Sequence, residues 1–368
     1  MKLLPIAAIA MTLAVATTGC KQNKTEHLAS LNVAYMDTTV APGADFYTYV
    51  NKGWMDANPL TAEHARYGQF DILNDSSETR VRNLIQNLGA SNPEEGSVAY
   101  KVWTVYSQAM DTARRNAEGA KPILADLKKI EDTPHEGMED LFLWMHGNYA
   151  SPFFGAGPME DLMNSTVYAM YVSGGGMGLG DRDYYLLNDE RNTAVRNAYK
   201  KLIATQMQNA GYTEADANRI MSNVMKIETA IADSAMTREE SRDIPRMYNP
   251  RTFAQLKESY PAINWDRFFI ETMEIASPDS VIVTDPKSMA QANKLMSSLS
   301  DREIKDYYLW KYVSQASSKL SDDFTNANFE FSKVMSGVQE LRPLWKRALD
   351  ATEGALGEAV GELYVEKY

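Results

Sequence analysis

Apolar residues recur every three or four positions along most of the chain, and this spacing predicts a mainly helical fold. One helix is predicted to begin at Asn92-Pro93-Glu94, because asparagine is a good N-cap and proline is favoured at the first helical position. A second helix is predicted to begin at Thr213 and a third at Ser300, where Glu303 lies at capping-box spacing. Apolar residues follow each of these starts on one helical face.

The C-terminal stretch from residue 341 to residue 364 is also apolar at helical spacing. Gly354, Gly357 and Gly361 lie within it at three- and four-residue intervals. Each glycine costs about 1 kcal/mol of helix propensity relative to alanine, so we expect a close backbone contact with another element there. The periodic pattern reaches Tyr368 without a glycine stop or a polar tail, which is typical of a helix that has been cut short.

The segment near 151–181 differs from the rest of the chain. Residues 151–155 and 164–172 favour short strands or extended loop, because β-branched and aromatic residues are enriched there. A glycine-rich run follows and ends at Asp181-Arg182-Asp183. It lacks the Gly-Lys-Ser/Thr of a phosphate-binding loop, and its acidic end would repel phosphate. We therefore expect a tight turn and a small β element within a helical domain.

The first twenty residues predict an export signal. Lys2 is followed by an apolar stretch over 3–16, which is too short for a comfortable membrane span, and then by small residues and Cys20. A Gly-Cys pair in this position resembles a lipobox, so we expect a signal peptide over 1–20 and acylation of Cys20. The polar residues that follow predict a flexible tether over 21–41.

The composition of the chain excludes some classes of function. The chain has 368 residues, of which 44% are hydrophobic, so it can bury a sizeable core. Asp and Glu outnumber Lys and Arg by 49 to 37, which gives a formal charge of −12. With no basic stripe, the sequence argues against a nucleic-acid partner. Cys20 is the only cysteine, so no disulfide can form within the chain.

The residues alone reveal no active site. A catalytic thiol is excluded because Cys20 lies in the predicted signal, and no Gly-x-Ser-x-Gly elbow occurs. His146 lies in an apolar helical stretch and is expected to be a packed residue. The nearest approach to a zinc-binding His-Glu-x-x-His is His135-Glu136-Gly137-Met138-Glu139, whose fifth position is Glu. We interpret it as the start of a helix.

Seven segments, in order along the chain, resemble the N-terminal region of the neprilysin family, which includes endothelin-converting enzyme and oligopeptidase O. The first is Pro-Gly-Ala-Asp-Phe-Tyr at residue 42, and the second is Arg-Tyr-Gly-Gln-Phe-Asp at residue 66. The segments cover residues 42–54, 66–71, 178–186, 238–250, 327–347, 354–359 and 363–368. Each segment is modest alone, but seven in sequence are specific.

The resemblance implies a fold of two mainly helical lobes around an enclosed cavity, with residues 42–368 forming the large helical lid. The other lobe would be thermolysin-like and would carry zinc on His-Glu-x-x-His, a motif that this chain lacks. Zinc is therefore expected in the full-length family enzyme, and none is expected on this chain. A separate or C-terminal zinc domain and peptide substrates are the implied partners.

Two substrate-contacting residues are implied by the same resemblance. The family arginine that can hold a peptide's C-terminal carboxylate corresponds to Arg66, and Asp71 corresponds to its orienting partner. A guanidinium group can bind a planar carboxylate through two parallel hydrogen bonds. Without the resemblance, a salt bridge within the helical domain explains the same two residues.

We therefore expect the N-terminal part of an exported zinc metalloendopeptidase, inactive by itself and anchored through lipid at the cell envelope, facing the periplasm or the cell surface. Two alternatives remain open. The chain could be a lipoprotein that binds peptides without cleaving them. It could also bind glycans, because its six Trp and twenty Tyr residues could stack on sugars.

Overall fold

The computed structural model describes residues 32–148 and 150–368, so Cys20, the predicted signal 1–20 and the first part of the predicted tether lie outside the described residues. Contacts divide the chain into two units, Met1–Thr61 and Ala62–Tyr368. Each unit is compact by itself.

The first unit is built on one helix and one 3₁₀ turn. Its elements are η1 (Val33–Tyr35) and α1 (Phe46–Ala57). Asp45 caps α1, because its carboxylate accepts a hydrogen bond from the Thr48 amide at 3.0 Å. Gly53 lies directly against η1, and a Cβ at this position would be 2.9 Å from the Cα of Tyr35. The end of the predicted tether therefore has secondary structure of its own.

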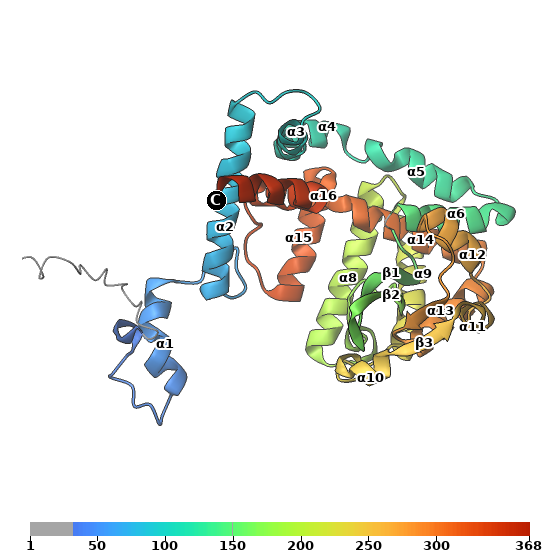
Figure 1. Cartoon of the computed structure of the whole chain (residues 1–368), viewed down its shortest axis with the longest axis horizontal. Coiled ribbons are helices and arrows are strands. Elements are labelled where there is room, and N and C mark those ends of the chain that lie inside the picture. The colour runs from blue at the N-terminus through green and yellow to red at the C-terminus, as the bar shows by residue number, and fades with distance from the viewer. Residues whose placement is uncertain (1–31, 149) are drawn as a thin grey trace, which may run out of the picture. The chain divides into compact units, whose positions relative to one another are not determined.

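The second unit is mainly helical, as predicted (Figure 1). Its first helices are α2 (Gln69–Ala90), α3 (Val98–Met110), α4 (Thr112–Glu118), α5 (Lys121–Asp132), η2 (His135–Gly137), α6 (Met138–Gly147), α7 (Asp183–Leu186), α8 (Glu190–Asn209) and α9 (Glu214–Ser234). They are followed by η3 (Glu240–Arg242), α10 (Ile244–Met247), α11 (Phe253–Ser259), α12 (Trp265–Arg267), η4 (Phe268–Thr272), α13 (Pro286–Ser298), α14 (Asp301–Ala316), η5 (Ser317–Lys319), α15 (Asp322–Ser336) and α16 (Leu344–Lys367).

A small sheet interrupts the helices, and its first two strands lie where the sequence predicts a β element. The strands are β1 (Phe154–Asp161), β2 (Asn164–Gly174), β3 (Asn249–Thr252) and β4 (Ser280–Val283), in the order β1-β2-β4-β3. β1 and β2 form an antiparallel pair, and β4 lies parallel to β2. The sequence analysis missed β3 and β4, because each has only four residues.

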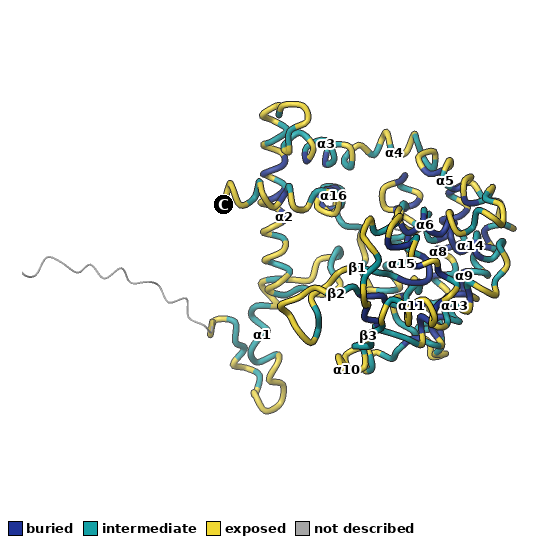
Figure 2. The backbone as a smooth tube through the Cα atoms, turned by 45° about the vertical axis from the view of Figure 1, so that its right-hand side comes forward, coloured by how far each residue is buried: buried dark blue, intermediate teal, exposed yellow. Residues whose placement is uncertain are grey.

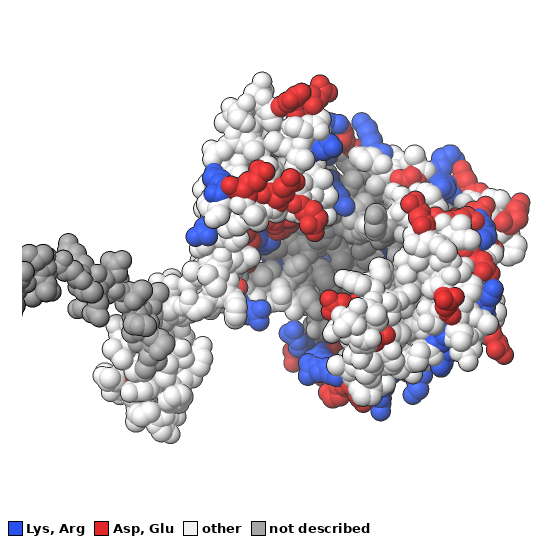
Figure 3. Space-filling view, in the orientation of Figure 1, with Lys and Arg blue, Asp and Glu red and all other residues white. Residues whose placement is uncertain are grey.

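Two hydrophobic cores hold the second unit together (Figure 2). The larger core includes the fully buried Trp265 and Tyr307 and is covered by α8, α9 and α14. The smaller core joins α2, α3 and α16 through Val81, Ile85, Val102, Tyr106, Ala348, Leu349 and Val360. On the face shown in Figure 3, acidic and basic side chains of the second unit are interspersed. Among the described helices, none is both long enough and apolar enough to span a bilayer.

Two of the three predicted helix starts are confirmed. Thr213 caps α9, and Ser300 forms a capping box with Glu303 at the start of α14. The start predicted at Asn92 is wrong, because α3 begins at Val98 after the cap residue Ser97. Asn92 has a φ of 52° and lies in the turn after α2. Asparagine tolerates this left-handed conformation, which suits a helix exit better than a helix start.

The expectation of close packing at the α16 glycines is also wrong. A Cβ at Gly354, Gly357 or Gly361 would have no other described atom within 4 Å beyond its own helix. Their neighbour Leu356 instead has non-helical angles, with φ at −137° and ψ at 34°, so α16 is kinked there. The glycines lower the helix propensity of this stretch. This effect, seen as the kink at Leu356, accounts for them better than a close contact does.

Candidate functional site

The two residues predicted to contact substrate lie at the start of the second unit. Arg66 is exposed, in the segment 62–68 that precedes α2. Asp71 is half-buried in the first turn of α2, where a negative charge is favoured by the helix dipole. Within residues 32–148 and 150–368, no ion pair joins Arg66 to Asp71. The role of Arg66 in substrate binding stays a prediction.

A buried ionic cluster lies beneath this segment and is centred on Lys346, which is only 6% exposed. We call it the Lys346 cluster, and it consists of Lys346 with Glu63, Asp75 and Glu78. The Lys346 Nζ lies 2.7 Å from Asp75, 3.3 Å from Glu63 and 3.5 Å from Glu78. These carboxylates come from segment 62–68 and from α2, so one lysine of α16 joins both to the smaller core.

Further hydrogen bonds fix the path of segment 62–68. The Tyr67 hydroxyl donates to Asp75 at 3.1 Å, so the residue next to Arg66 is tied to the Lys346 cluster. The carbonyl oxygen of Ala62 accepts from the backbone amides of Gln339 and Glu340, at 2.9 and 3.0 Å. The backbone that carries Arg66 is therefore held from both sides.

Arg342 extends the same network. Its guanidinium group donates to Glu78 and to Asp350, each at 2.6 Å. Two segments that resemble one family in sequence, 66–71 and 342–347, thus meet in space through the Lys346 cluster and Arg342. Nothing in the sequence predicted this meeting. The available signal was a lysine beside the apolar positions of α16, and periodicity alone does not assign it a partner.

The pKa shifts agree with this geometry. Burial acts to raise the pKa of Asp75, but the hydrogen bond and the charge of Lys346 outweigh burial and lower it. Burial acts to lower the pKa of Lys346, but hydrogen bonds to Asp75 and Glu63 raise it. Both groups are therefore held in their charged forms, as a paired network requires.

A second polar network holds the segment 178–186, which resembles another family motif. The fully buried Glu228 of α9 accepts hydrogen bonds from Tyr185 at 2.7 Å and from Tyr199 at 3.1 Å. The Tyr185 hydroxyl also accepts from the Leu179 amide at 2.9 Å. Burial raises the pKa of Glu228 to about 7. The Tyr185 hydroxyl and its partners Glu228 and Tyr199 are buried, so these hydrogen bonds position the backbone of the motif.

The same network fixes the backbone of the glycine-rich run, where the sequence predicts a tight turn. A Cβ on Gly178 would be 1.9 Å from the Tyr199 hydroxyl, so only glycine fits there without rearrangement. Asp181, at the end of the run, forms an ion pair with Arg238, which belongs to a different family segment. Two further segments that resemble the family are thus neighbours in the fold.

His135 and His146 take the positions expected from the sequence. His146 is buried against the rings of Phe142, Phe154 and Phe268, and burial lowers its pKa to about 3. His135 begins η2, directly before α6, and its Nδ1 lies 3.0 Å from Asp301. Across the part of the chain that the structure describes, no three His, Cys, Asp or Glu residues are grouped so that they could hold a metal ion. These residues therefore do not fit a zinc site.

Comparison with known proteins identifies the family. Residues 42–368 match the model of the N-terminal part of peptidase family M13. Endothelin-converting enzyme 1 of Rattus norvegicus is 30% identical over 343 residues, which cover 90% of this chain and 44% of the relative. Neprilysin of Mus musculus is 25% identical over 400 residues, which cover 99% of this chain and 52% of the relative. The chain thus spans about half the length of these relatives.

Solved structures agree with the sequence relatives. The zinc metalloprotease Zmp1 of Mycobacterium tuberculosis, in complex with an inhibitor, superposes with a TM-score of 0.84 at 26% identity, over 92% of this chain and 52% of that protein. PepO from Lactobacillus rhamnosis matches in fold with a TM-score of 0.74 at 15% identity, over 89% of this chain and 52% of that one. The family match over residues 42–368 shows that the chain belongs to peptidase family M13, the neprilysin-like zinc metallopeptidases.

Proposed function

We propose that this chain supplies the helical, substrate-enclosing part of an exported zinc metalloendopeptidase. The observation that carries this proposal is the match of residues 42–368 to family M13, together with the absence of His-Glu-x-x-His from the 368 residues. Zinc in such an enzyme polarises the scissile carbonyl and activates water. The ligands for that ion would come from a zinc domain outside these residues, so the chain alone is expected to bind peptides without cleaving them.

Arg66 is the residue proposed to hold the C-terminal carboxylate of the peptide. Its guanidinium group is exposed, while the backbone on either side of it is fixed by Tyr67 and Ala62. An anchored backbone that carries a free cation limits the entropy lost when the cation binds a carboxylate. Asp71 is proposed to orient Arg66 when a peptide is bound.

The first experiment compares peptides that differ only at the C-terminus. Binding of a fluorescent apolar peptide with a free carboxylate would be measured by anisotropy, alongside the same peptide as an amide. Arg66→Met should weaken binding of the free acid by about tenfold or more and leave the weaker binding of the amide unchanged. Arg242→Met, which removes an exposed cation of η3, is the matched control.

The same preparation would be tested for zinc content and for peptide cleavage. Peptide binding without zinc and without cleavage supports the proposal. Cleavage that appears when an M13 zinc domain is added would support it further. Stoichiometric zinc with cleavage would contradict it, because the metal ligands would then lie within this chain. Equal binding of the free acid by the parent protein and by Arg66→Met would remove Arg66 from the proposed site.

We also propose that the chain is a lipoprotein of the cell envelope, acylated at Cys20. The support is the sequence pattern of residues 1–20, which combines one basic residue, a short apolar core and a Gly-Cys end. Cys20→Ser should move the protein from the membrane fraction to the soluble fraction and abolish acylation detected by mass spectrometry. Unchanged membrane association of Cys20→Ser would contradict a lipid anchor at this residue.

A further inference from the structure

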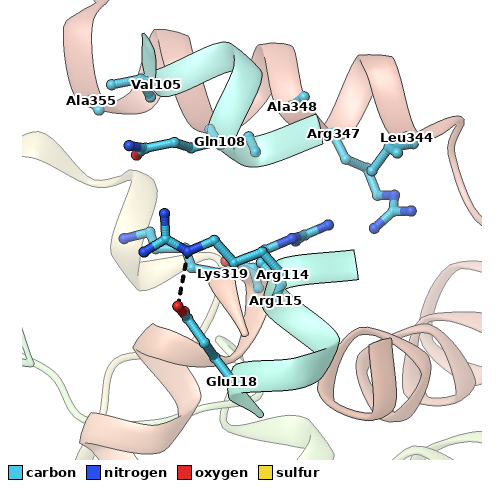
Figure 4. A pocket seen from close by; sticks show the side chains of 13 residues that line it. Val105, Gln108, Arg114, Arg115, Glu118, Lys319, Leu344, Arg347, Ala348 and Ala355 are labelled. Carbon is cyan, nitrogen blue, oxygen red and sulfur yellow. Dashed lines mark hydrogen bonds and ion pairs between the residues drawn. The ribbon is translucent and has the colours of Figure 1, made fainter. Parts of the chain in front are cut away.

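A pocket of about 440 Å³ lies in the second unit, with α3 and the first half of α16 on one side and α4 on the other (Figure 4). η5 supplies a third wall. Basic side chains dominate its polar lining, namely Arg114, Arg115, Lys319 and Arg347. Glu118 is the acidic residue among the lining side chains, and its carboxylate is paired with Arg114 at 2.9 Å. Three cations of the lining are therefore left without a carboxylate partner in the described part of the chain.

The most unusual of these cations is Arg115. Its Nε and Nη2 atoms are shielded from solvent, and within the described residues neither has a hydrogen-bond acceptor. Buried donors in folded proteins are nearly always paired, since an unpaired one loses its bond to water without replacement. In Figure 4 the Arg115 side chain extends toward the side of the pocket on which Arg347 lies.

Arg347 has one internal hydrogen bond, from its Nε to the carbonyl oxygen of Arg342 at 3.1 Å. Its remaining guanidinium donors have no acceptor among the described atoms. Burial and the charge of Arg115 lower the pKa of Arg347, and the charge of Asp322 acts in the opposite direction. Two guanidinium groups thus repel each other across a partly desolvated space, and an anion between them would remove that repulsion.

An adjoining pocket of about 450 Å³ shares Lys319, Arg347 and Ala351 with the first. Thr325 of α15 lines it, is only 7% exposed, and its hydroxyl has no hydrogen-bond partner in the described structure. Asp350 also lines this second pocket, but its carboxylate is paired with Arg342 at 2.6 Å. A buried, unpartnered hydroxyl is a second and independent sign of a polar ligand.

We propose that this pair of pockets binds a small polyvalent oxyanion, of which phosphate is the simplest example, between Arg115, Lys319 and Arg347. Guanidinium groups bind tetrahedral oxyanions through paired hydrogen bonds, and a lysine adds a mobile charge at the rim. The wall of Val105, Ala348 and Ala351 leaves room for a small apolar body attached to the anion. The site is separate from Arg66 and does not depend on the proposed peptidase function.

The test uses the full chain and inorganic phosphate, with pyrophosphate as a second probe and chloride at matched ionic strength as the reference. Phosphate should raise the melting temperature in proportion to the logarithm of its concentration once that concentration exceeds the dissociation constant, because a ligand that binds only the folded state stabilises it by RT ln(1 + [L]/Kd). Arg115→Met and Arg347→Met should each weaken phosphate binding, measured by calorimetry, by about tenfold or more. Arg115→Met should also melt higher than the parent protein in chloride, since it removes the repulsion.

One control and one further binding-site variant keep the result specific. Arg242→Met removes a cation far from this pocket in the sequence and should bind phosphate as the parent does. Lys319→Ala changes an exposed side chain, so it should weaken binding without affecting the fold. A melting temperature that rises linearly with phosphate, equally in parent and variants, would be a general salt effect and would overturn the proposal. Unchanged phosphate affinity in Lys319→Ala and Arg115→Met would also overturn it.

Discussion

At the scale of single residues, the most consequential side chains are charged groups that the fold buries. Lys346 is enclosed by three carboxylates, whereas Glu228 is enclosed by two tyrosine hydroxyls. In the first arrangement the pKa of Asp75 is lowered and that of Lys346 is raised, so both are held in their charged forms. In the second arrangement burial raises the pKa of Glu228 to about 7. A residue's type therefore says little about its protonation state until its neighbours are known.

Lys346→Met should destabilise the second unit by about 2–3 kcal/mol, because it leaves the carboxylates of Glu63 and Asp75 without a cation and Glu78 with Arg342 alone. The loss is smaller than for a fully buried pair, since Asp75 is partly exposed and can be rehydrated. Urea denaturation at neutral pH would measure it. Lys333→Met, which breaks the exposed pair with Glu330, should cost less than about 1 kcal/mol. Equal losses in the two variants would contradict the role of the cluster.

His146→Phe should change how stability depends on pH. Burial lowers the pKa of His146 from 6.5 to about 3, so the neutral ring stabilises the fold above pH 6.5. This stability is lost as the pH falls from 6.5 toward 3, because the unfolded chain takes up the proton first. A phenylalanine cannot titrate, so the stability of the variant relative to the parent protein should increase progressively as the pH falls over this range. Melting temperatures of both proteins between pH 7 and pH 4 would test this prediction. A difference between variant and parent that stays constant with pH would contradict it.

At the scale of elements, close approaches rather than periodicity decide which segments are neighbours. The Gly178 backbone touches the Tyr199 hydroxyl, and Gly53 touches the backbone of η1. In both places a side chain would separate two elements that belong together. Helical spacing could not reveal this, since it describes one element at a time.

Gly178→Ala should cost about 1–3 kcal/mol, because the new methyl group displaces the Tyr199 hydroxyl from Glu228. Gly155→Ala is the matched control, since a Cβ there meets no described atom within 4 Å. Thermal unfolding of both variants would measure the difference. If Gly178→Ala melted at the same temperature as Gly155→Ala, the hydrogen bonds around Glu228 would not hold this turn.

At the scale of the whole molecule, the chain consists of two compact units that meet in sequence between Thr61 and Ala62. The second unit is held by two cores, and the smaller core depends on contacts between the α2–α3 pair and α16, which are far apart in sequence. Formation of this core therefore requires contacts over a long stretch of sequence, which are slow to form.

Apart from cuts in the predicted tether over 21–41, limited proteolysis should cut first between Ala57 and Ala62, where Pro59, Leu60 and Thr61 are exposed and lie outside helices. The product that begins near Ala62 should resist further cleavage, because its cores lie within it. Mass spectrometry of the early fragments would identify the site. Early cuts within α2 or α16 would contradict the independence of the second unit.

The sequence by itself determined the fold class, the starts of α9 and α14, a β element near 151–181 and membership of a peptidase family, because these depend on local spacing and on ordered motifs. It placed Asn92 wrongly and assigned the α16 glycines a contact that they do not make, because cap residues and glycines each serve several local geometries. Only the tertiary structure decided that Lys346 meets Asp75, that Gly178 must be glycine, and that Arg115 lines a pocket without a carboxylate partner among the described residues. Such pairings join residues that are far apart in the sequence, and a local pattern of residues carries no information about contacts over that separation.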